Sequence, residues 1–414
     1  MTYVEFFEKD AVENICACLI HVPERVILIG DSLKLMQRHV ERYKHLFAQR
    51  GVHIEFVCKA INKNKLQNVV DELSAILDSY GDCVFDVTGG ESVYLLAMGI
   101  LFERYKGIQI HKINIRNNSL LDCDMDGLTI TEDNIPMLTV EESVRLNGGD
   151  IIFDDVRTGA TYQWVWDDEQ KADIDALWEI CRRDVRRWNI QTSIFSAAER
   201  FRNRDEEQLV MEAPMPYLQD YLENMGSGHV AFKRVVNDLF NAGLLTYVDS
   251  NERTFTVAYK NETVRHCLLK AGQILEMKIY SAACTAKEAN GSCTYHDVMT
   301  GVQLDWDGII HAQREAYDTE NEVDVIMMHG MIPVFVSCKN GAFTSEELYK
   351  LNTVAQKFGG KYVKKVLVAT ALDSTCDAPE YLRQRAKDMN ILLVENIQEM
   401  NEKQLEKVVR SFWK

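Results

Sequence analysis

Two stretches near the C-terminus, Asn321-Glu-Val-Asp-Val325 and Val334-Phe-Val-Ser-Cys-Lys-Asn-Gly341, decide the fold of this sequence. Both are rich in β-branched and apolar residues, so each predicts a strand. Alternate residues of a strand share a face, so Glu322 and Asp324 are expected to point the same way. Lys339 ends the second strand. Charged side chains inside apolar strands need partners, and the two strands are therefore a candidate site of chemistry.

The segments around these strands predict the element order α, β, β, β, α, β. A turn at His329-Gly330 is expected to join the second and third strands as a hairpin. Period two puts Ser337 on the face of Lys339 and Cys338 on the opposite face. The expected elements are a helix over 268–280, strands over 297–305, 322–328 and 333–339, a helix over 344–358 and a strand over 363–370.

The side chains that converge at this hairpin suit phosphodiester cleavage. Carboxylates at Asp324 and Glu276 would hold a hard divalent cation that lowers the pKa of bound water. Lys339 would orient that water or stabilise charge on the phosphate. A structural alternative is a buried ion pair between Asp324 and Lys339. Glu347 is expected to complete a helix-capping box begun by Thr344.

The first third of the chain alternates strands and helices, which predicts a parallel sheet covered on both faces. Strands are expected over 26–29, 53–58, 83–87 and 109–115. Ligands of such sheets bind beyond the carboxyl ends of the strands, where N–H groups at helix starts favour phosphate or ribose. The candidate ligand-binding residues at these ends are Asp31, Ser32, Asn62, Lys63, Thr88, Gly89, Gly90, Glu91, Ser92 and Arg116.

The turn over residues 88–92 also has a purely structural interpretation. It lacks the lysine of a Walker loop and the spacing of a GxGxxG fingerprint. It would then be a tight strand-to-helix turn that a hydroxyl caps.

The middle of the chain predicts a helical connector. A segment rich in Gly and Asp, 147–161, indicates a boundary, and helical patterns fill most of 169–242. Two β-rich runs with a polar turn follow from Gly243, as a wing follows a helix in winged-helix proteins. One helical face is expected to carry Arg182, Arg183, Arg186 and Arg187, either as a solvated face or as phosphate contacts.

Composition limits the classes of function. A chain of 414 residues is long enough for at least two cores. Its net charge of −17 disfavours a protein that coats polyanions and leaves room only for a local basic groove. Such a groove is expected near Lys357, Lys361, Lys364 and Lys365.

The cysteines and histidines argue against a zinc site. The 11 cysteines include no CxxC pair and the 10 histidines no HExxH spacing, so we expect reduced, buried thiols in a cytoplasmic protein. No apolar run approaches the roughly 18 residues of a membrane span, so neither a membrane partner nor a signal peptide is expected.

These motifs together resemble the CRISPR-associated ancillary nucleases of type III systems, in which a CARF sensor domain is fused to a PD-(D/E)xK nuclease domain. The similarity spans the chain and rests on Asp86-Val-Thr-Gly-Gly-Glu-Ser92 and on the two C-terminal stretches quoted above. It implies an α/β fold in three parts. These are a Rossmann-like CARF parallel sheet over 1–150, a helical and winged-helix-like connector over 151–262, and an αβββαβ PD-(D/E)xK nuclease domain over 263–414.

The resemblance further implies a homodimer whose CARF domains bind a cyclic oligoadenylate, usually cyclic tetra-adenylate, across the two-fold axis. Binding would activate metal-dependent cleavage of nucleic acid, with single strands of DNA or RNA favoured and Mn²⁺ or Mg²⁺ as cofactor. Carried over residue by residue, the motif assigns Asp324 as metal ligand, Lys339 as catalytic lysine and Glu276 as the helix acid. This chain departs from the motif at Ser337, where the family has an acid. Metal ligation would then also draw on Glu322 or on the carbonyl of Cys338.

Two other functions stay open. One is a ligand-responsive CARF transcription regulator that uses the middle region and has a degenerate nuclease lobe. The other is a restriction-type DNase that needs no second messenger. Retention of a specific duplex without cleavage would select the first, and cutting without an activator would select the second.

Overall fold

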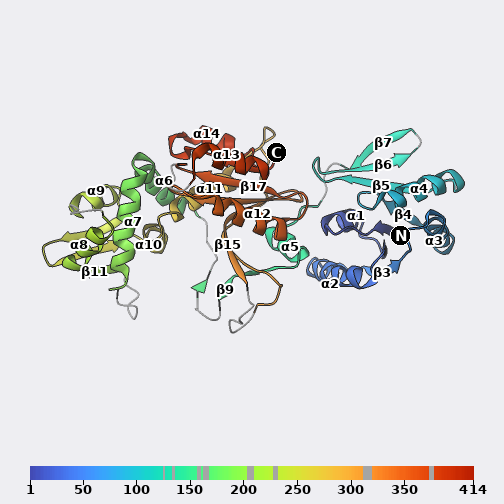
Figure 1. Cartoon of the computed structure of the whole chain (residues 1–414), viewed down its shortest axis with the longest axis horizontal. Helices are drawn as coiled ribbons and strands as arrows, with labels where there is room; N and C mark the ends of the chain where they lie inside the picture. Colours follow the sequence, from blue (N-terminus) through green and yellow to red (C-terminus); the bar gives the residue numbers. More distant parts are fainter. Residues whose placement is uncertain are drawn as a thin grey trace.

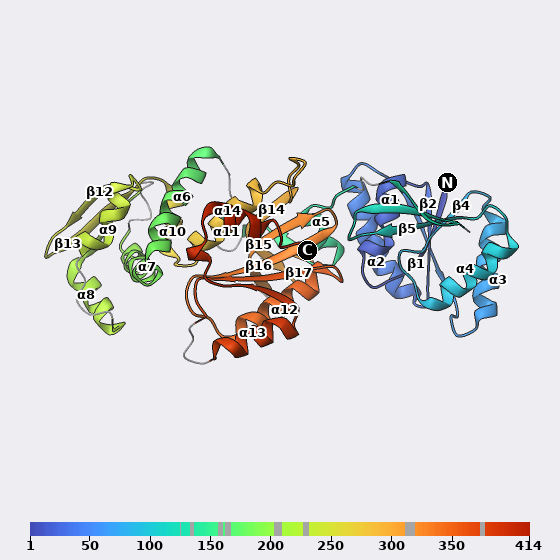
Figure 2. The same ribbon diagram turned by 90° about the horizontal axis from the view of Figure 1, so that it is seen from above.

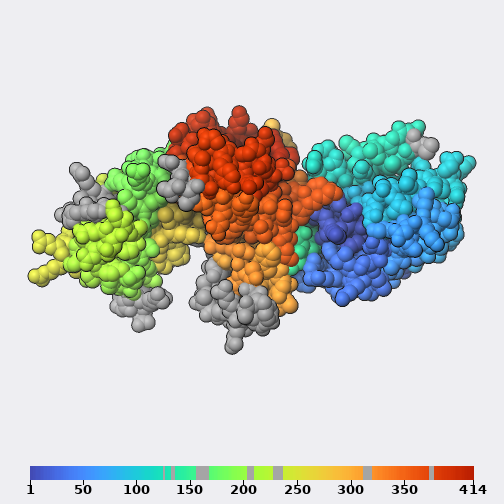
Figure 3. All heavy atoms as spheres, in the orientation of Figure 1, coloured from blue at the N-terminus to red at the C-terminus, as the bar shows by residue number. Residues whose placement is uncertain are grey.

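The computed structural model describes residues 1–124, 126–132, 136–155, 160–161, 167–202, 209–226, 232–310, 319–372 and 377–414. Three lobes lie in a row along the long axis of the molecule (Figures 1 and 3). The C-terminal lobe, orange to red, lies between the N-terminal lobe and the middle of the chain, and the view in Figure 2 keeps this order. None of the described helices combines the length and the apolar character that a membrane crossing requires.

The N-terminal lobe is built on a seven-stranded sheet with the order β3-β2-β1-β4-β5-β6-β7. The first five strands in this order are parallel, as predicted, and β6 and β7 extend the sheet as antiparallel strands. The central strand β1 was not predicted from the sequence. Its five residues are all buried, including an acid, so it lacks the polar alternation of a half-exposed strand. The strands are β1 Thr2–Phe6, β2 Arg25–Gly30, β3 Glu55–Ala60, β4 Cys83–Asp86, β5 Gln109–Asn114, β6 Ser119–Asp124 and β7 Gly127–Glu132.

Helices cover both faces of this sheet, as the alternation of elements predicted. One face packs against α1, Cys16–His21, and α2, Leu33–Gln49. The short 3₁₀ helix η1, Val12–Asn14, directly precedes α1. The other face packs against α3, Leu66–Ser79, and α4, Ser92–Arg104. The carboxyl ends of β2, β3 and β4 therefore point into loops that each lead to a helix.

The middle lobe combines helices with a three-stranded antiparallel sheet of order β11-β13-β12. The β12–β13 hairpin confirms the two predicted β-rich runs, whereas β11 interrupts the region predicted as helical. Residues 203–208 and 227–231 of that region lie outside the described part of the chain. The elements are α6 Asp168–Arg183, α7 Val185–Glu199, β11 Val210–Pro214, α8 Met215–Asn224, α9 Phe232–Asn241, β12 Leu245–Ser250, β13 Thr254–Tyr259 and α10 Glu262–Leu269.

The four arginines of this region do not share one helical face. Asp184 ends α6 and caps α7 by accepting from the N–H of Arg187, so the first two arginines belong to α6 and the last two to α7. Arg182 donates to the carbonyl of Gln398 in the C-terminal lobe. The expected arginine face is therefore wrong, because a helix break falls in the middle of the run.

The C-terminal lobe contains a six-stranded sheet of order β18-β17-β16-β15-β14-β8. The predicted α, β, β, β, α, β order is confirmed, and α13, β18, the 3₁₀ helix η2 (Ile397–Glu399) and α14 extend it. One sheet face packs on α11 and the middle lobe, and the other packs on α12, α5 and the N-terminal lobe. The elements are α5 Val140–Leu146, β8 Asp150–Ile152, α11 Gln273–Thr285, β14 Asp297–Asp305, β15 Glu320–His329, β16 Ile332–Lys339, α12 Ser345–Gly359, β17 Lys364–Ala369, α13 Pro379–Asp388, β18 Ile391–Val394 and α14 Glu402–Val409.

The described residues that follow the N-terminal sheet, 136–155 and 160–161, form helix and strand. The boundary expected after residue 150 falls inside β8, which pairs with β14 and so forms an edge of the C-terminal sheet. The two short strands that follow, β9 (Asp154–Asp155) and β10 (Ala160–Thr161), pair with each other. The Gly and Asp content of residues 147–161 predicts a boundary, but Ile151 and Ile152 are buried in the core.

Candidate active site and ligand edge

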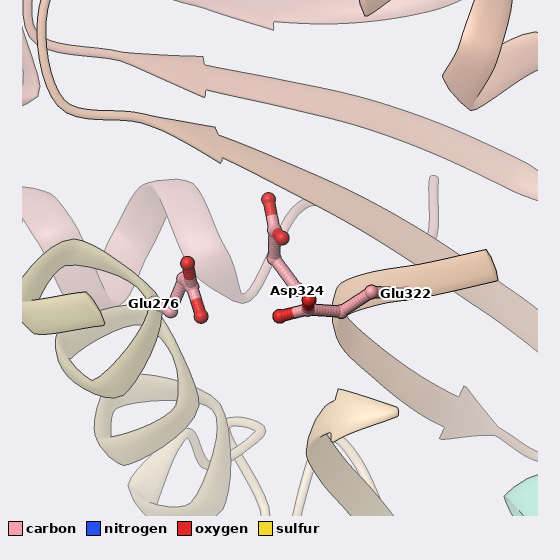
Figure 4. A group of neighbouring side chains, drawn as sticks. All are labelled: Glu276, Glu322 and Asp324. Atoms are coloured by element: carbon pink, nitrogen blue, oxygen red, sulfur yellow. The ribbon is translucent and has the colours of Figure 1, made fainter. Parts of the chain in front are cut away.

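Three carboxylates meet near the start of the inner strand β15 of the C-terminal sheet. Glu322 and Asp324 come from β15, and Glu276 comes from the first turn of α11 (Figure 4). One oxygen from each lies within 4.8 Å of the others. The structure therefore brings Glu276 and Asp324 together as predicted, and Glu322 belongs to the same group. Glu276 is only 2% exposed, and its Oε2 has no hydrogen-bond partner within the described residues.

Burial and mutual repulsion perturb the acids. Burial raises the pKa of Glu276 to about 7, and the neighbouring charge of Asp324 adds to the rise. Burial also raises the pKa of Asp324, against the opposing effect of the N–H of Cys338. Burial acts on Glu322 as well, but the hydrogen bond and charge of Lys270 outweigh it and lower the pKa of Glu322. Hard oxygen donors with an unpartnered buried oxygen among them fit Mg²⁺ or Mn²⁺.

The two strands of the hairpin hold Asp324 in a fixed orientation. Val325 is opposite Val336 in the β15–β16 register, which puts Asp324 beside Ser337. Oδ2 of Asp324 accepts from the N–H of Cys338 at 2.6 Å and from the hydroxyl of Ser337 at 3.3 Å. Ser337, at the position where the family that the chain resembles has an acid, is thus a hydrogen-bond donor to the candidate metal ligand Asp324.

The predicted face assignment of β16 is confirmed. Ser337 and Lys339 line one small cleft together with Glu322 and Asp324. The thiol of Cys338 lies on the other side, in the core shared with the middle lobe, and burial raises its pKa far above the usual range. The link from Cys338 to the site therefore runs through its main chain.

Lys339 is paired with Glu347. Its Nζ lies 2.7 Å from Oε2 of Glu347, and both residues line the cleft. Thr344 makes no side-chain cap bond, so the expected capping box is wrong, because Glu347 turns toward the sheet instead of back to its helix end. The alternative of an Asp324–Lys339 ion pair is also wrong: within the described ranges, Glu347 is the ion-pair partner of Lys339.

Lys270 is a member of the site that the sequence analysis missed. It is the C-cap residue that follows α10, and its Nζ lies 2.8 Å from Oε1 of Glu322 and 3.5 Å from Oε1 of Glu276. The available sequence signal was its position six residues before Glu276, across the turn between two helices. Contact with Glu322 spans 52 residues and depends on tertiary packing.

At the carboxyl edge of the N-terminal sheet, three predicted residues come together. Nζ of Lys63 lies 2.6 Å from Oδ2 of Asp31 and also pairs with Glu91. These residues come from the loops after β3, β2 and β4. Asn62 accepts from the N–H of Asn64 at 3.1 Å, which shapes the Lys63 loop.

The Thr88-Gly89-Gly90 turn packs closely against the end of β1. Thr88 uses its hydroxyl within the fold, donating to Asp86 and accepting from the N–H of Ile113 at 2.7 Å. Gly90 has a φ of +103°, and a Cβ there would lie 2.6 Å from Cβ of Phe6. Its N–H donates to Oε1 of Glu8 at 3.0 Å. Glu8 was missed because β1 was missed.

The two serines of this edge serve the helices differently. Ser32 caps α2 by accepting from the N–H of Leu35 at 3.4 Å. Ser92 is already the first residue of α4, and the cap residue before it, Glu91, makes no side-chain cap bond. The hydroxyl cap expected for the 88–92 turn is therefore wrong.

Arg116 lies in a different environment from the other predicted ligand residues. It lines a cavity of about 860 Å³ against the C-terminal lobe, together with Lys361, Lys364, Lys365 and Lys414. Lys364 pairs in register with Val334, which puts it roughly 17 Å along the sheet from Lys339, at about 3.3 Å per residue. This basic cavity is thus at the opposite end of the sheet from the carboxylates. Lys357, on the last turn of α12, lies apart from this cavity, with its Nζ over the ring of Trp306.

No protein-family model matches the chain, and no curated protein matches it. The solved structures that are similar to it over nearly its whole length include two named proteins. One is protein VC1899 from Vibrio cholerae, with a TM-score of 0.73 and 18% identity, covering 100% of this chain and 97% of that chain. The other is Can2 from Sulfobacillus thermosulfidooxidans in complex with cyclic tetra-adenylate, with a TM-score of 0.63 and 15% identity, covering 99% and 97%. The chain therefore has the same overall α/β fold as these two proteins.

Proposed function

We propose that the chain is a divalent-metal-dependent nuclease that a cyclic oligoadenylate activates, acting as a homodimer in type III CRISPR defence. One observation carries this proposal. Carboxylates from α11 and β15 meet at the edge of a cleft that also contains Lys339, the arrangement that metal-assisted phosphodiester hydrolysis requires.

Each side chain of the site has a role in this proposal. Glu276, Glu322 and Asp324 would hold the ion, which when bound makes water more acidic and offsets charge on the phosphate. Asp324 is kept in one orientation by its bond from the N–H of Cys338. Lys339 would leave Glu347 to donate to a phosphate oxygen or to the attacking water.

The candidate ligand site is the carboxyl edge of the N-terminal sheet. Can2, which shares the fold, was solved with cyclic tetra-adenylate. In this chain the Lys63 ammonium, which is paired with Asp31 and Glu91, is the cation at that edge, and the N–H of Gly90, which bonds Glu8, lies in the neighbouring turn. We include Asp31, Asn62 and Glu91 among the ribose and adenine contacts, and leave Thr88 and Ser32 as residues that shape the loops.

Support for a dimer comes from α4, which follows the Gly89-Gly90 turn. This helix is apolar nearly all round, and Leu95 and Leu96 are 45% and 62% exposed. An apolar helix face beside a ligand edge fits a two-fold contact with a second copy of the chain, across which a symmetric cyclic ligand meets identical groups. The proposed substrate is single-stranded DNA or RNA.

A single cleavage panel tests the proposal. Labelled single- and double-stranded DNA and RNA are incubated with cyclic tri-, tetra- or hexa-adenylate and with Mn²⁺ or Mg²⁺. We expect cutting only where metal and one activator are both present, and none by Asp324→Ala or Lys339→Ala. Absence of cutting in every arm, or equal cutting by these variants, would overturn the proposal.

Two further outcomes select the alternative functions. Sequence-specific retention of a duplex without cleavage would favour a ligand-responsive regulator that uses the winged-helix-like lobe. Cutting that needs metal but no activator would favour a restriction-type DNase. Light scattering with and without the ligand measures the oligomeric state, and a monomer under both conditions would contradict the proposed dimer.

A further inference from the structure

We infer that the ammonium of Lys270 competes with the divalent ion for the carboxylates of the metal site. When no metal is bound, the ammonium is ion-paired with these carboxylates and neutralises part of their charge. The inference rests on the proposed function in one respect, that Glu276 and Glu322 are metal ligands. It assigns to Lys270 a role in setting the affinity and occupancy of that site.

The contacts of the ammonium define this role. Nζ of Lys270 lies 2.8 Å from Oε1 of Glu322 and 3.5 Å from Oε1 of Glu276, so it bridges an acid of the strand and an acid of the helix. Across the described part of the chain, it is the cation that forms ion pairs with these acids, since Lys339 is paired with Glu347. Lys270 therefore supplies the positive charge that three crowded carboxylates need in the absence of an ion.

A metal ion would need the same oxygens. Ligand oxygens of the three acids lie within 4.8 Å of one another, so an ion among them would share its space and its charge with the ammonium. Two cations on one small set of carboxylates repel each other across the part-buried site. Binding of the ion and withdrawal of the ammonium are therefore coupled, and the coupling is reciprocal.

The backbone of Lys270 is held while its side chain has room to move. The next carbonyl, of Ala271, accepts from Nε1 of Trp188 at 3.3 Å and from Nδ2 of Asn340 at 2.9 Å. These bonds tie the turn to α7 and to the residue that follows Lys339. The Lys270 side chain itself is 51% exposed, so its ammonium can swing into solvent without unfolding the turn.

The chain offers a matched control in Lys350. It lines the same cleft as Glu322 and Asp324 and carries the same charge, but makes no ion pair with the three acids among the described residues. Replacing Lys270 or Lys350 with methionine removes one positive charge near the site and keeps an unbranched side chain of similar length. The two variants therefore separate direct competition from a general change in the local electrostatic field.

The experiment measures Mn²⁺ binding to the full chain by calorimetry, with free Mn²⁺ followed by electron paramagnetic resonance. We expect Lys270→Met to bind Mn²⁺ roughly tenfold more tightly than wild type, at the lower end of the range for coupled binding events because the site is partly exposed. Lys350→Met should change the affinity by less than about threefold. In EDTA, Lys270→Met should melt below wild type, since its acids have lost their cation, and Mn²⁺ should raise its Tm by more.

Several results would overturn the inference: unchanged or weaker Mn²⁺ binding by Lys270→Met, an equal gain in Lys350→Met, or no Mn²⁺ binding by wild type. Lys270→Gln, checked for native circular dichroism, replaces the methionine variant should that fail to fold. Failure of the proposed function gives a different pattern. Wild type would then bind Mn²⁺ and show the affinity gain in Lys270→Met, yet cut no nucleic acid with any activator.

Discussion

Each of the two large sheets has a pair of acids in it or beside it, and the two pairs differ in what surrounds them. Glu5 on β1 and Asp86 on β4 are adjacent in register, and each is 1% exposed. Burial raises the pKa of Asp86 to about 7 and that of Glu5 well above its usual value. Glu276 and Asp324 are perturbed in the same direction and also mainly by burial.

The surroundings of the two pairs differ, and only those of the C-terminal pair suit the proposed chemistry. Glu5 has the thiol of Cys18 as its partner, 3.7 Å away, and Asp86 holds Thr88 in place. Asp324 lines a cleft that also contains Lys339, and Glu276 lies 3.5 Å from Nζ of Lys270. A raised pKa is therefore common to both pairs, whereas nearby cations and a cleft distinguish the pair proposed to be catalytic.

The largest expected effect comes from neutralising an acid of the C-terminal pair. Asp324→Asn keeps an oxygen that can accept from the N–H of Cys338 but loses the charge that would bind the ion. We expect kcat for activated cleavage to fall roughly 10²- to 10⁴-fold, as for loss of a principal electrostatic or acid–base group. Glu5→Gln, the corresponding change in the other pair, should leave kcat unchanged. A similar loss of kcat in both variants would remove the distinction.

The N-terminal pair should appear in the pH dependence of stability. The folded pKa of Asp86 lies near 7, above its unfolded value of about 3.8, so the folded state keeps a proton that the unfolded chain releases. The contribution of Asp86 to the free energy of unfolding is complete below the unfolded pKa and is lost as the pH rises through 7.

Urea unfolding at pH 5 and pH 7.5 checks this expectation. Wild type should lose about 2 kcal/mol of its free energy of unfolding relative to Asp86→Asn, since one pKa unit corresponds to about 1.4 kcal/mol. Parallel pH profiles of the two proteins would show that Asp86 ionises normally in the fold.

An acid at position 337, where the family that the chain resembles has one, would sharpen the comparison. In Ser337→Asp a fourth carboxylate would face Asp324, whose Oδ2 now lies 3.3 Å from the Ser337 hydroxyl. We expect Mn²⁺ to bind about tenfold more tightly, by about 1.4 kcal/mol, and the Tm in EDTA to fall through repulsion between the acids. Ser337→Asn, which adds no charge, is the control, and an equal gain in affinity there would contradict the electrostatic explanation.

The smallest effect is expected at Glu347. Its ion pair with Lys339 joins two partly exposed side chains, and such pairs are worth about 0.2–1 kcal/mol. Glu347→Gln should therefore change kcat by less than about fivefold and leave Mn²⁺ binding unaltered. A loss as large as that of Asp324→Asn would make Glu347 a direct participant in catalysis.

Much of the fold and of the C-terminal site follows from local sequence pattern. Alternation along β15 and β16 predicts which side chains share a face, and the helix pattern places Glu276 beside the sheet. The contacts that could not be predicted depend on packing between segments that are distant in the sequence. Glu347 pairs with Lys339 because of how α12 lies on the sheet, and Lys270 reaches Glu322 across 52 residues.

The N-terminal lobe shows the same limit. Strand β1 was missed because it carries Glu5 at a fully buried position, where polar alternation gives no guide. Arg116 follows β5 as predicted, but its environment is decided by the C-terminal lobe that packs against it. Local pattern determines the order of the elements, whereas the neighbours of a loop side chain depend on how the lobes pack.

The short path from α5 to β8 has a mechanical consequence. The N–H of Val140 at the start of α5 bonds Oδ2 of Asp297 at 2.7 Å, and β8 is hydrogen-bonded to β14, which in turn pairs with the strand of Asp324. The segment from α5 to β8 is therefore anchored to the C-terminal sheet at both of its ends. A displacement of this segment would act on β14 and, through it, on β15, which carries Glu322 and Asp324.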